Sequence, residues 1–342
     1  MEARSVDAIP DGPCWQYEPK WDGFRCLLLR SEGLVSLQSK SGQDLTRYFP
    51  ELAEAATALG APAFLLDGEI VIPRGQSLSF DDLLQRIHPA ASRIKKLSRG
   101  TPALYIAFDL LRLGRSDLAR EPLAQRRERL EIFAAEQFRT APPFRLSPAS
   151  TRLSDAQRWL ASSGEGSDGV IAKRLDLPYQ GGGREGMQKI KRYRSADCVI
   201  GGFRYAEKAI AGRKVIGSLL LGLYDNKGLL HHVGHSSAIK ADDRPALTER
   251  LQRLATKRSF TGNAPGGPSR WSTRRSAEWQ PVRPKLVVEV CYDHFSEGRF
   301  RHGTRIMRWR PDKAPRQCRL DQLEQKASMP ARLVSRRKRV AT

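Results

Sequence analysis

Cysteine is scarce in this 342-residue chain, and the spacing of the cysteines argues against folds stabilised by zinc or by disulfides. The five cysteines are odd in number and scattered, at Cys14, Cys26, Cys198, Cys291 and Cys318. None lies in a Cys-x-x-Cys pair, so the sequence supports neither a zinc module nor a disulfide framework. Such cysteine usage fits a reducing compartment.

Long apolar runs are absent as well. The first residues, from Met1 to Ser5, contain no apolar signal core. No stretch approaches the roughly 20 apolar residues that a membrane-spanning helix needs. The sequence therefore predicts no export and no membrane partner, and we expect a cytoplasmic protein.

Acidic residues are outnumbered by basic ones. The chain has 59 Lys and Arg against 37 Asp and Glu, which gives a net charge of +22. This excess indicates a polyanionic partner, because a basic surface displaces the counterions condensed on a nucleic-acid backbone. The alternative is a basic protein that is indifferent to nucleic acids. The length suits two domains with separate cores.

Apolar patterning predicts an α+β protein whose first domain spans residues 1–194. Strands are expected at 15–17, 24–29, 34–38, 64–72, 103–111 and 168–173, and helices at 50–59, 80–88, from 122 onward and at 154–160. The Arg126-Arg127 pair is expected on the solvent side of the helix that opens near Pro122.

A second domain is expected at residues 195–322. It has short strands at 198–200, 217–224, 229–233, 285–292 and 304–309, with one helix at 246–255. This composition resembles a small closed β-barrel of the OB type. We expect residues 261–284 to form an exposed loop, and 323–342 to form a basic C-terminal tail.

The stretch from Glu18 to Arg25 carries the most chemistry. Strands flank it, and Lys20 is followed by Asp22 and Gly23 on a predicted tight turn. Glycine there allows the backbone to approach a ligand closely. The arrangement suits a lysine amine that attacks a phosphate. The alternative is a surface lysine beside a turn.

Further short motifs follow in order. They are Lys40-Ser41-Gly42, Asp67-Gly68-Glu69, Phe108-Asp109, Asp168-Gly169-Val170-Ile171-Ala172-Lys173, Lys189-Ile190-Lys191 and Arg310-Pro311-Asp312-Lys313. Each is weak alone, but together and in this order they make the chain resemble the ATP-dependent DNA ligases, most of all the compact bacterial C type. The resemblance runs from about residue 17 to residue 315. It implies a nucleotidyltransferase (adenylation) domain followed by an OB-fold domain.

The resemblance implies that Lys20 attacks the α-phosphate of ATP and holds AMP covalently. The amine must be uncharged to do so, and the cations Lys189 and Lys191 favour that state while binding the phosphate. In isolation these two lysines read as one basic face of an exposed strand.

Other residues are implied to bind the nucleotide. Glu69 accepts from a ribose hydroxyl, Phe108 stacks on adenine, Glu18 lies near the adenine amino group, and Lys173 binds phosphates. Without the resemblance, Phe108 would be read as a core residue and Glu69 as a turn carboxylate.

Asp168 is implied to bind the catalytic Mg²⁺ or Mn²⁺, at a position where many of these ligases have glutamate. Its side chain is one methylene shorter, and Glu165 is the alternative carboxylate. Arg25 and Lys40 are expected at the 5′-phosphate of the nick. Arg310 and Lys313 are expected to orient the leaving pyrophosphate from a hinged second domain.

The expected function is sealing of nicks in duplex DNA, in DNA repair. The expected protein is a monomer that acts with ATP and nicked DNA, and with a DNA end-binding or repair protein as a further partner. An RNA ligase and an mRNA-capping guanylyltransferase are the enzymatic alternatives. A non-catalytic nucleic-acid-binding protein is the alternative from another class.

Overall fold

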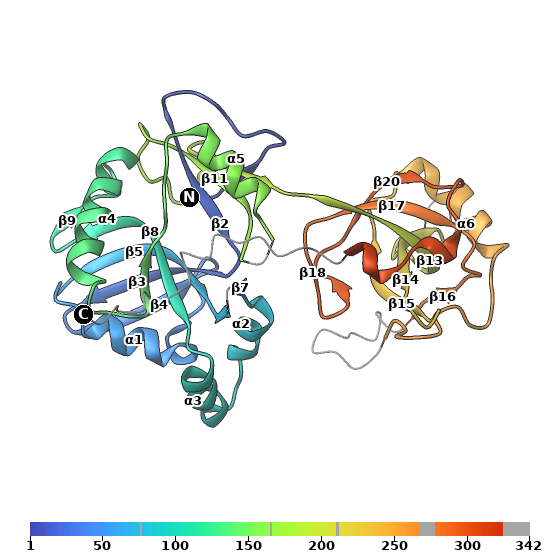
Figure 1. Ribbon diagram of the computed structural model, residues 1–342, viewed down its shortest axis with the longest axis horizontal. Coiled ribbons are helices and arrows are strands. Elements are labelled where there is room, and N and C mark those ends of the chain that lie inside the picture. Colours follow the sequence, from blue (N-terminus) through green and yellow to red (C-terminus); the bar gives the residue numbers. More distant parts are fainter. Residues whose placement is uncertain (76, 165, 210–211, 267–277, 324–342) are drawn as a thin grey trace, which may run out of the picture. The chain divides into compact units, whose positions relative to one another are not determined.

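The computed structural model describes residues 1–75, 77–164, 166–209, 212–266 and 278–323 (Figure 1). The chain forms two compact units, the first spanning Met1–Arg192 and the second beginning at Tyr193. Residues 267–277 of the predicted loop, Glu165, and all but the first residue of the predicted tail lie outside the described part. The predicted boundary between 194 and 195 stays a prediction.

Two sheets make up most of the first unit. The first sheet has the order β1 (Arg4–Ser5), β12 (Met187–Lys191), β11 (Ser167–Arg174) and β2 (Trp15–Trp21). The second has the order β10 (Phe144–Leu146), β8 (Leu104–Leu113), β5 (Phe64–Val71), β3 (Phe24–Ser31) and β4 (Leu34–Ser39), with β9 (Ser116–Asp117) on β8. A small hairpin pairs β6 (Pro73–Arg74) with β7 (Ser77–Leu78).

The tight turn predicted after Lys20 is present: only Asp22 and Gly23 separate β2 from β3, and they link the two sheets. A Cβ added to Gly23 would lie 2.2 Å from the carbonyl oxygen of Ile70. Glycine is therefore required here because β5 approaches the backbone closely. The sequence prediction was that a ligand makes this close approach. The predicted hairpin at 24–38 is correct: β3 and β4 are joined by Glu32 and Gly33, both with positive φ, as in a two-residue type I′ turn.

Helices cover the sheets of the first unit. They are α1 (Pro50–Thr57), α2 (Phe80–Arg86), α3 (Ala91–Gly100), α4 (Leu123–Gln137) and α5 (Leu153–Ala161), with a 3₁₀ turn at Thr46–Tyr48. Helix α3 was not predicted. Its sequence has few large apolar residues, so the amphipathic stripe is short.

The prediction that Arg126 and Arg127 face solvent is wrong. Both are buried, with 1% and 8% of their surface exposed. Arg126 donates two hydrogen bonds of 2.9 Å to the carboxylate of Asp109, which compensates the burial of its charge. The ion pair with Asp109 thus stabilises Arg126 in the interior, where the helical pattern alone predicts an exposed side chain.

The second unit is built on one six-stranded sheet. Its order is β15 (Leu230–Ser236), β14 (Ile216–Tyr224), β13 (Arg194–Tyr205), β17 (Val287–Tyr292) and β20 (Arg305–Trp309), with β16 (Gln280–Pro281) on β13. Helix α6 (Arg244–Gln252), the pair β18 (Phe295–Ser296) and β19 (Arg299–Phe300), and 3₁₀ turns at Ala241–Asp243, Pro315–Gln317 and Leu320–Leu323 complete it.

No pairing closes this sheet between β15 and β20 within the described residues. The expected closed barrel is therefore a partly open one, which the OB fold allows. A single apolar core that includes Phe203, Leu221 and Val288 holds it together. Among the described helices, none is both long enough and apolar enough to cross a membrane.

Candidate active site

A cavity of about 550 Å³ opens in the first unit, where β2, β11 and β12 of one sheet face β3, β5 and β8 of the other. Eight of the predicted site residues line it: Glu18, Lys20, Arg25, Lys40, Glu69, Phe108, Lys173 and Lys189. They come from segments up to 171 positions apart, and only the tertiary fold brings them together.

Lys20 stands near the end of β2, and its closest charged neighbour is a carboxylate. The distance from Lys20 Nζ to Asp168 Oδ1 is 2.7 Å, and Lys191 Nζ lies 3.1 Å from Asp168 Oδ2. The sequence analysis named the cations Lys189 and Lys191 as neighbours of the amine, and the structure adds the carboxylate of Asp168. Asp168 holds Lys20 and Lys191 together in the nucleotide-free protein.

Gly169 permits this arrangement. Its φ is +154°, and an added Cβ would lie 1.9 Å from the carbonyl oxygen of Ile190. The close approach of β11 and β12 puts Gly169 opposite Lys191 in the ladder. A side chain at this position would push apart the strands that carry Asp168 and the paired lysines.

Lys189 is a half-buried cation of the pocket. It lies on β12 two residues before Lys191, and alternation along a strand therefore puts both on one face of the sheet. Burial lowers the pKa of Lys189, and the nearby charges of Lys20, Lys191 and Lys40 lower it further. Its ammonium has no ion pair within the described part of the chain, so it is available to bind a phosphate.

Glu18 and Lys173 form a buried pair at another wall. Glu18 is 2% exposed, and its Oε1 accepts hydrogen bonds from Gln16 Nε2 at 2.9 Å and from Lys173 Nζ at 2.7 Å. The ammonium of Lys173 also lies 4.4 Å from the centroid of the Phe108 ring. Lys173, expected to bind phosphates, is here held by the residue expected to bind adenine.

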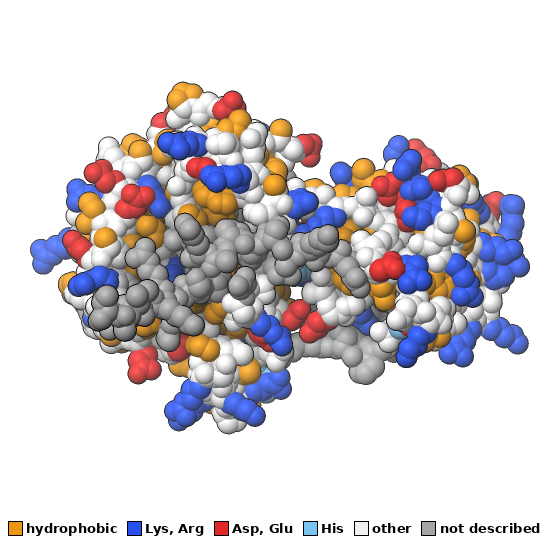
Figure 2. Space-filling model, viewed as in Figure 1, with side chains coloured by type: hydrophobic (Ala, Val, Ile, Leu, Met, Phe, Trp, Pro, Cys, Tyr) orange, Lys and Arg blue, Asp and Glu red, His pale blue; other side chains and the backbone are white. Residues whose placement is uncertain are grey.

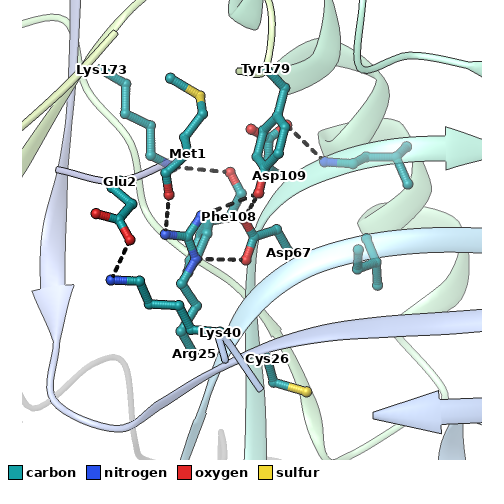
Figure 3. A network of polar contacts seen from close by, with 12 residues as sticks. Met1, Glu2, Arg25, Cys26, Lys40, Asp67, Phe108, Asp109, Lys173 and Tyr179 are labelled. Carbon is teal, nitrogen blue, oxygen red and sulfur yellow. Dashed lines mark hydrogen bonds and ion pairs between the residues drawn. The ribbon is translucent and has the colours of Figure 1, made fainter. Parts of the chain in front are cut away.

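Arg25 is fixed from behind by a carboxylate that the sequence analysis did not assign (Figure 3). Arg25 donates to Asp67 through Nε at 3.1 Å and Nη2 at 2.7 Å, and Tyr179 donates its hydroxyl proton to the same carboxylate at 2.8 Å. Asp67 is completely buried. The only sequence signal for Asp67 is its position in the motif that contains Glu69. No motif indicated Tyr179.

Glu69 faces Arg25 across the β3–β5 ladder. Burial raises the pKa of Glu69 to about 8, although the positive charges of Lys20 and Arg25 act in the opposite direction. The side chain is therefore mostly protonated at neutral pH, and can donate as well as accept a hydrogen bond at a ribose.

The N-terminal segment forms part of the cavity wall, which the sequence analysis missed. Strand β1 pairs with β12 in parallel, with Ser5 opposite Lys189. Glu2 lies 2.9 Å from Lys40, as Figure 3 shows, and 2.9 Å from Arg184. The hydrogen bonds from these two cations lower the pKa of Glu2 to about 2. No sequence motif indicated Glu2 or Arg184, because the contact depends on pairing between the two ends of this unit.

The predicted residues Arg310 and Lys313 belong to the second unit. There, the carboxylate of Asp197 on β13 accepts from both: Arg310 Nη1 at 3.0 Å and Lys313 Nζ at 2.6 Å. Asp312 binds the other side of the Arg310 guanidinium, at 2.9 Å. The carboxylates of Asp197 and Asp312, both in the second unit, therefore hold the two cations in place.

The donor set at Asp168 fits a metal ion that arrives with phosphates. Within the described residues, no group of three or more His, Cys, Asp or Glu side chains could hold a metal ion alone. Mg²⁺ in nucleotide sites commonly uses one or two carboxylates together with phosphate oxygens. Asp168 offers such a carboxylate beside Lys20.

Comparison with known proteins gives two family matches. The model described as ATP dependent DNA ligase domain matches residues 3–191, and the one described as ATP dependent DNA ligase C terminal region matches residues 212–313. DNA ligase C2 of Mycolicibacterium smegmatis is 44% identical over 339 residues, which cover 95% of this chain and 93% of that protein.

Two further relatives are more distant. The multifunctional non-homologous end joining DNA repair protein LigD of Mycobacterium tuberculosis is 33% identical over 88% of this chain and 37% of that longer protein. A solved Lig E DNA ligase, described as binding DNA with a minimal scaffold, has a TM-score of 0.55 at 16% identity and covers 91% of this chain and 100% of that chain. These matches confirm the predicted fold class.

Proposed function

The chain belongs to the family of ATP-dependent DNA ligases, and we propose that it seals nicks in duplex DNA through AMP carried on Lys20. One observation carries the residue assignment: the Lys20 amine opens onto the same 550 Å³ cavity as Glu69, Phe108 and Lys189. A nucleotide in that cavity would meet an amine, an aromatic ring, a carboxyl group and a free cation at once.

The first step transfers AMP to the protein. The uncharged Lys20 nitrogen attacks the α-phosphorus of ATP; a P–N bond forms and the P–O bond to pyrophosphate breaks. Asp168 must first release the amine that it holds at 2.7 Å. Lys189, which has no ion pair among the described residues, lines the same cavity and is proposed to bind the phosphate.

Two more steps complete the reaction. The 5′-phosphate of the nick attacks the same phosphorus, which breaks the P–N bond and transfers AMP to the DNA. The 3′-hydroxyl then attacks the 5′-phosphate, the phosphodiester forms, and AMP leaves. Lys40, whose side chain is 60% exposed at the edge of the cavity, is well situated for the nick phosphate once Glu2 releases it.

Adenosine recognition is assigned to the deeper wall. Phe108 would stack on adenine, and Glu69 would bind the ribose hydroxyl. The buried Glu18–Lys173 pair beside the Phe108 ring gives that end of the cavity a fixed donor and acceptor. Arg25, held in place by its ion pair with Asp67, is proposed to bind the nick. Arg310 and Lys313 would orient pyrophosphate.

A divalent metal ion, Mg²⁺ or Mn²⁺, is proposed at Asp168. It would neutralise phosphate oxygens as negative charge shifts during transfer. The carboxylate of Asp168, with the ammonium of Lys191 beside it, would fix the position of those oxygens.

The cellular role is proposed to be DNA repair. A relative that is 33% identical is named a non-homologous end joining DNA repair protein, which supports this assignment. We further propose that the protein acts as a monomer, with a DNA end-binding or repair protein as partner. The functional division is proposed as an adenylation domain at residues 1–194, an OB domain at 195–322 and a basic tail at 323–342.

Intact-mass measurement after incubation with ATP and Mg²⁺ tests the proposal. The wild type should gain the mass of one AMP and Lys20→Ala should not, whereas Lys227→Ala, at an exposed lysine of the second unit, should behave as wild type. Adduct formation in Lys20→Ala would refute the assignment. A preference for GTP would favour a guanylyltransferase, and sealing of all-RNA but not all-DNA nicks would favour an RNA ligase.

A further inference from the structure

Helix α3 presents a cationic face that none of the ligase motifs includes. Its apolar side is small: Ile94 is buried, Leu97 is half-buried, and the helix packs against α1 and α2 through them. The opposite side exposes Lys95, Lys96 and Arg99, and Arg93 is exposed on the flank, one turn before Leu97. Figure 2 shows the corresponding cluster of Lys and Arg side chains at the lower end of the first unit, where Figure 1 places α3.

These charges are not compensated within the protein. The helix contains no acidic residue, and none of the four cations takes part in an ion pair in the part of the chain that the structure describes. Lys95 and Arg99 are four positions apart and Lys96 and Arg99 three, so like charges are neighbours and destabilise the helix. Arg93 lies in the first turn, where the helix dipole disfavours a cation.

A second cavity extends from the active site to the connection before α3. Its volume is about 750 Å³, and its lining includes Arg25, Lys40 and Glu69 of the site together with Ile87. Ile87 is the C-cap of α2, and α3 begins four residues later. Arg47 donates hydrogen bonds to the carbonyl oxygens of the two residues that follow Ile87, which ties the α2–α3 connection to the first unit.

We propose that α3 binds the sugar–phosphate backbone of the duplex that flanks the nick. The proposal rests on the assignment of the chain as a DNA ligase. Ten helical residues span about 15 Å, and one DNA strand presents a phosphate every ~3.4 Å along the axis. The cations of α3 span six residue steps from Arg93 to Arg99, or about 9 Å, and therefore match about three successive phosphates. Backbone contacts of this kind carry no sequence information, as a nick ligase requires.

The dependence of DNA affinity on salt tests the proposal. The α3 variant replaces all four cations with glutamine, which keeps helix propensity; the substitutions are Arg93→Gln, Lys95→Gln, Lys96→Gln and Arg99→Gln. A matched control removes four exposed cations elsewhere in the first unit; these substitutions are Arg115→Gln, Arg120→Gln, Arg129→Gln and Arg139→Gln. Both proteins lose the same net charge.

Each phosphate contact contributes about −0.9 to the slope of log affinity against log salt concentration. The α3 variant should therefore reduce the magnitude of the slope for a nicked duplex by about 2 to 3, and the control by less than about 1. Self-adenylation with ATP should be unchanged in both. The double variant Lys95→Gln/Lys96→Gln should show about half of the effect and guards against misfolding of the quadruple variant.

Equal slopes for the α3 variant and the control would overturn the proposal. So would an α3 effect of the same size in self-adenylation, because that step involves no DNA. A wild-type protein that fails to self-adenylate would instead refute the ligase assignment. A protein that self-adenylates and binds nicked DNA without any contribution from α3 refutes the present inference alone.

Discussion

Replacing Asp197 with asparagine should slow the transfer of AMP from ATP to Lys20 and leave the last sealing step almost unchanged. One carboxylate holds both Arg310 and Lys313, at 3.0 and 2.6 Å. Asparagine keeps the shape and one acceptor oxygen but loses the charge. We propose that both cations orient the leaving pyrophosphate, which is present only in the first step.

The size of the effect follows from the contacts that remain. A hydrogen bond to a charged group contributes about 1.5–3 kcal/mol. Arg310 retains Asp312 at 2.9 Å, and both cations are partly exposed, so solvent screening reduces the loss. We expect about 1.5–3 kcal/mol less stabilisation of the transition state, which is about 10- to 150-fold in rate.

Two single-turnover assays separate the steps. Self-adenylation with labelled ATP reports the first step, and sealing of a nick that already carries AMP reports the last. The control is Glu289→Gln, which makes the same charge change at the residue opposite Asp197 in the β13–β17 ladder, where Glu289 binds Arg308 at 2.6 Å. Equal slowing of both steps by Asp197→Asn, or no slowing of the first, would refute the reasoning.

Three further outcomes are expected. The contribution of protonated Glu69 to the free energy of unfolding is fully present below its ordinary pKa of 4.5 and is lost as the pH rises through about 8. Between pH 5 and pH 9 the free energy of unfolding of Glu69→Gln, measured with denaturant, should therefore rise by a few kcal/mol relative to that of the wild type. Asp67→Asn should lower the free energy of unfolding by about 3–5 kcal/mol in the same assay, because the charge of Arg25 loses its buried partner. Gly169→Ala should abolish self-adenylation, since its Cβ meets the carbonyl of Ile190 at 1.9 Å, and activity equal to wild type would contradict that geometry.

Local patterns were enough to predict the elements around the site. The hairpin of β3 and β4 was visible because apolar strands flank a Glu-Gly turn, and β8 was visible as an apolar run. Patterns failed where the environment of a side chain depends on a distant partner. Arg126 looks solvent-exposed by position in its helix, but Asp109, 17 residues earlier, neutralises it in the interior.

The same reason explains what was missing from the predicted site. Lys20 and Asp168 are 148 positions apart, and their contact depends on the β2–β11 ladder. Glu2 and Arg184 meet only because β1 pairs with β12. Motifs indicated which residues belong to the site. They could not indicate which charges neutralise each other before the nucleotide binds.

In the nucleotide-free protein, internal carboxylates bind the cations that are proposed to bind the substrate phosphates. The cationic side chains that line the cavity would repel one another if no anion lay near them. In the nucleotide-free protein, Lys20 is therefore paired with Asp168, Lys40 with Glu2 and Lys173 with Glu18. Asp168 also binds Lys191, and Glu2 also binds Arg184. A phosphate that replaces one of these carboxylates can bind the same cations and leaves no buried cation unpaired. The structure therefore favours exchange of internal anions for substrate phosphates as the event that frees the Lys20 amine.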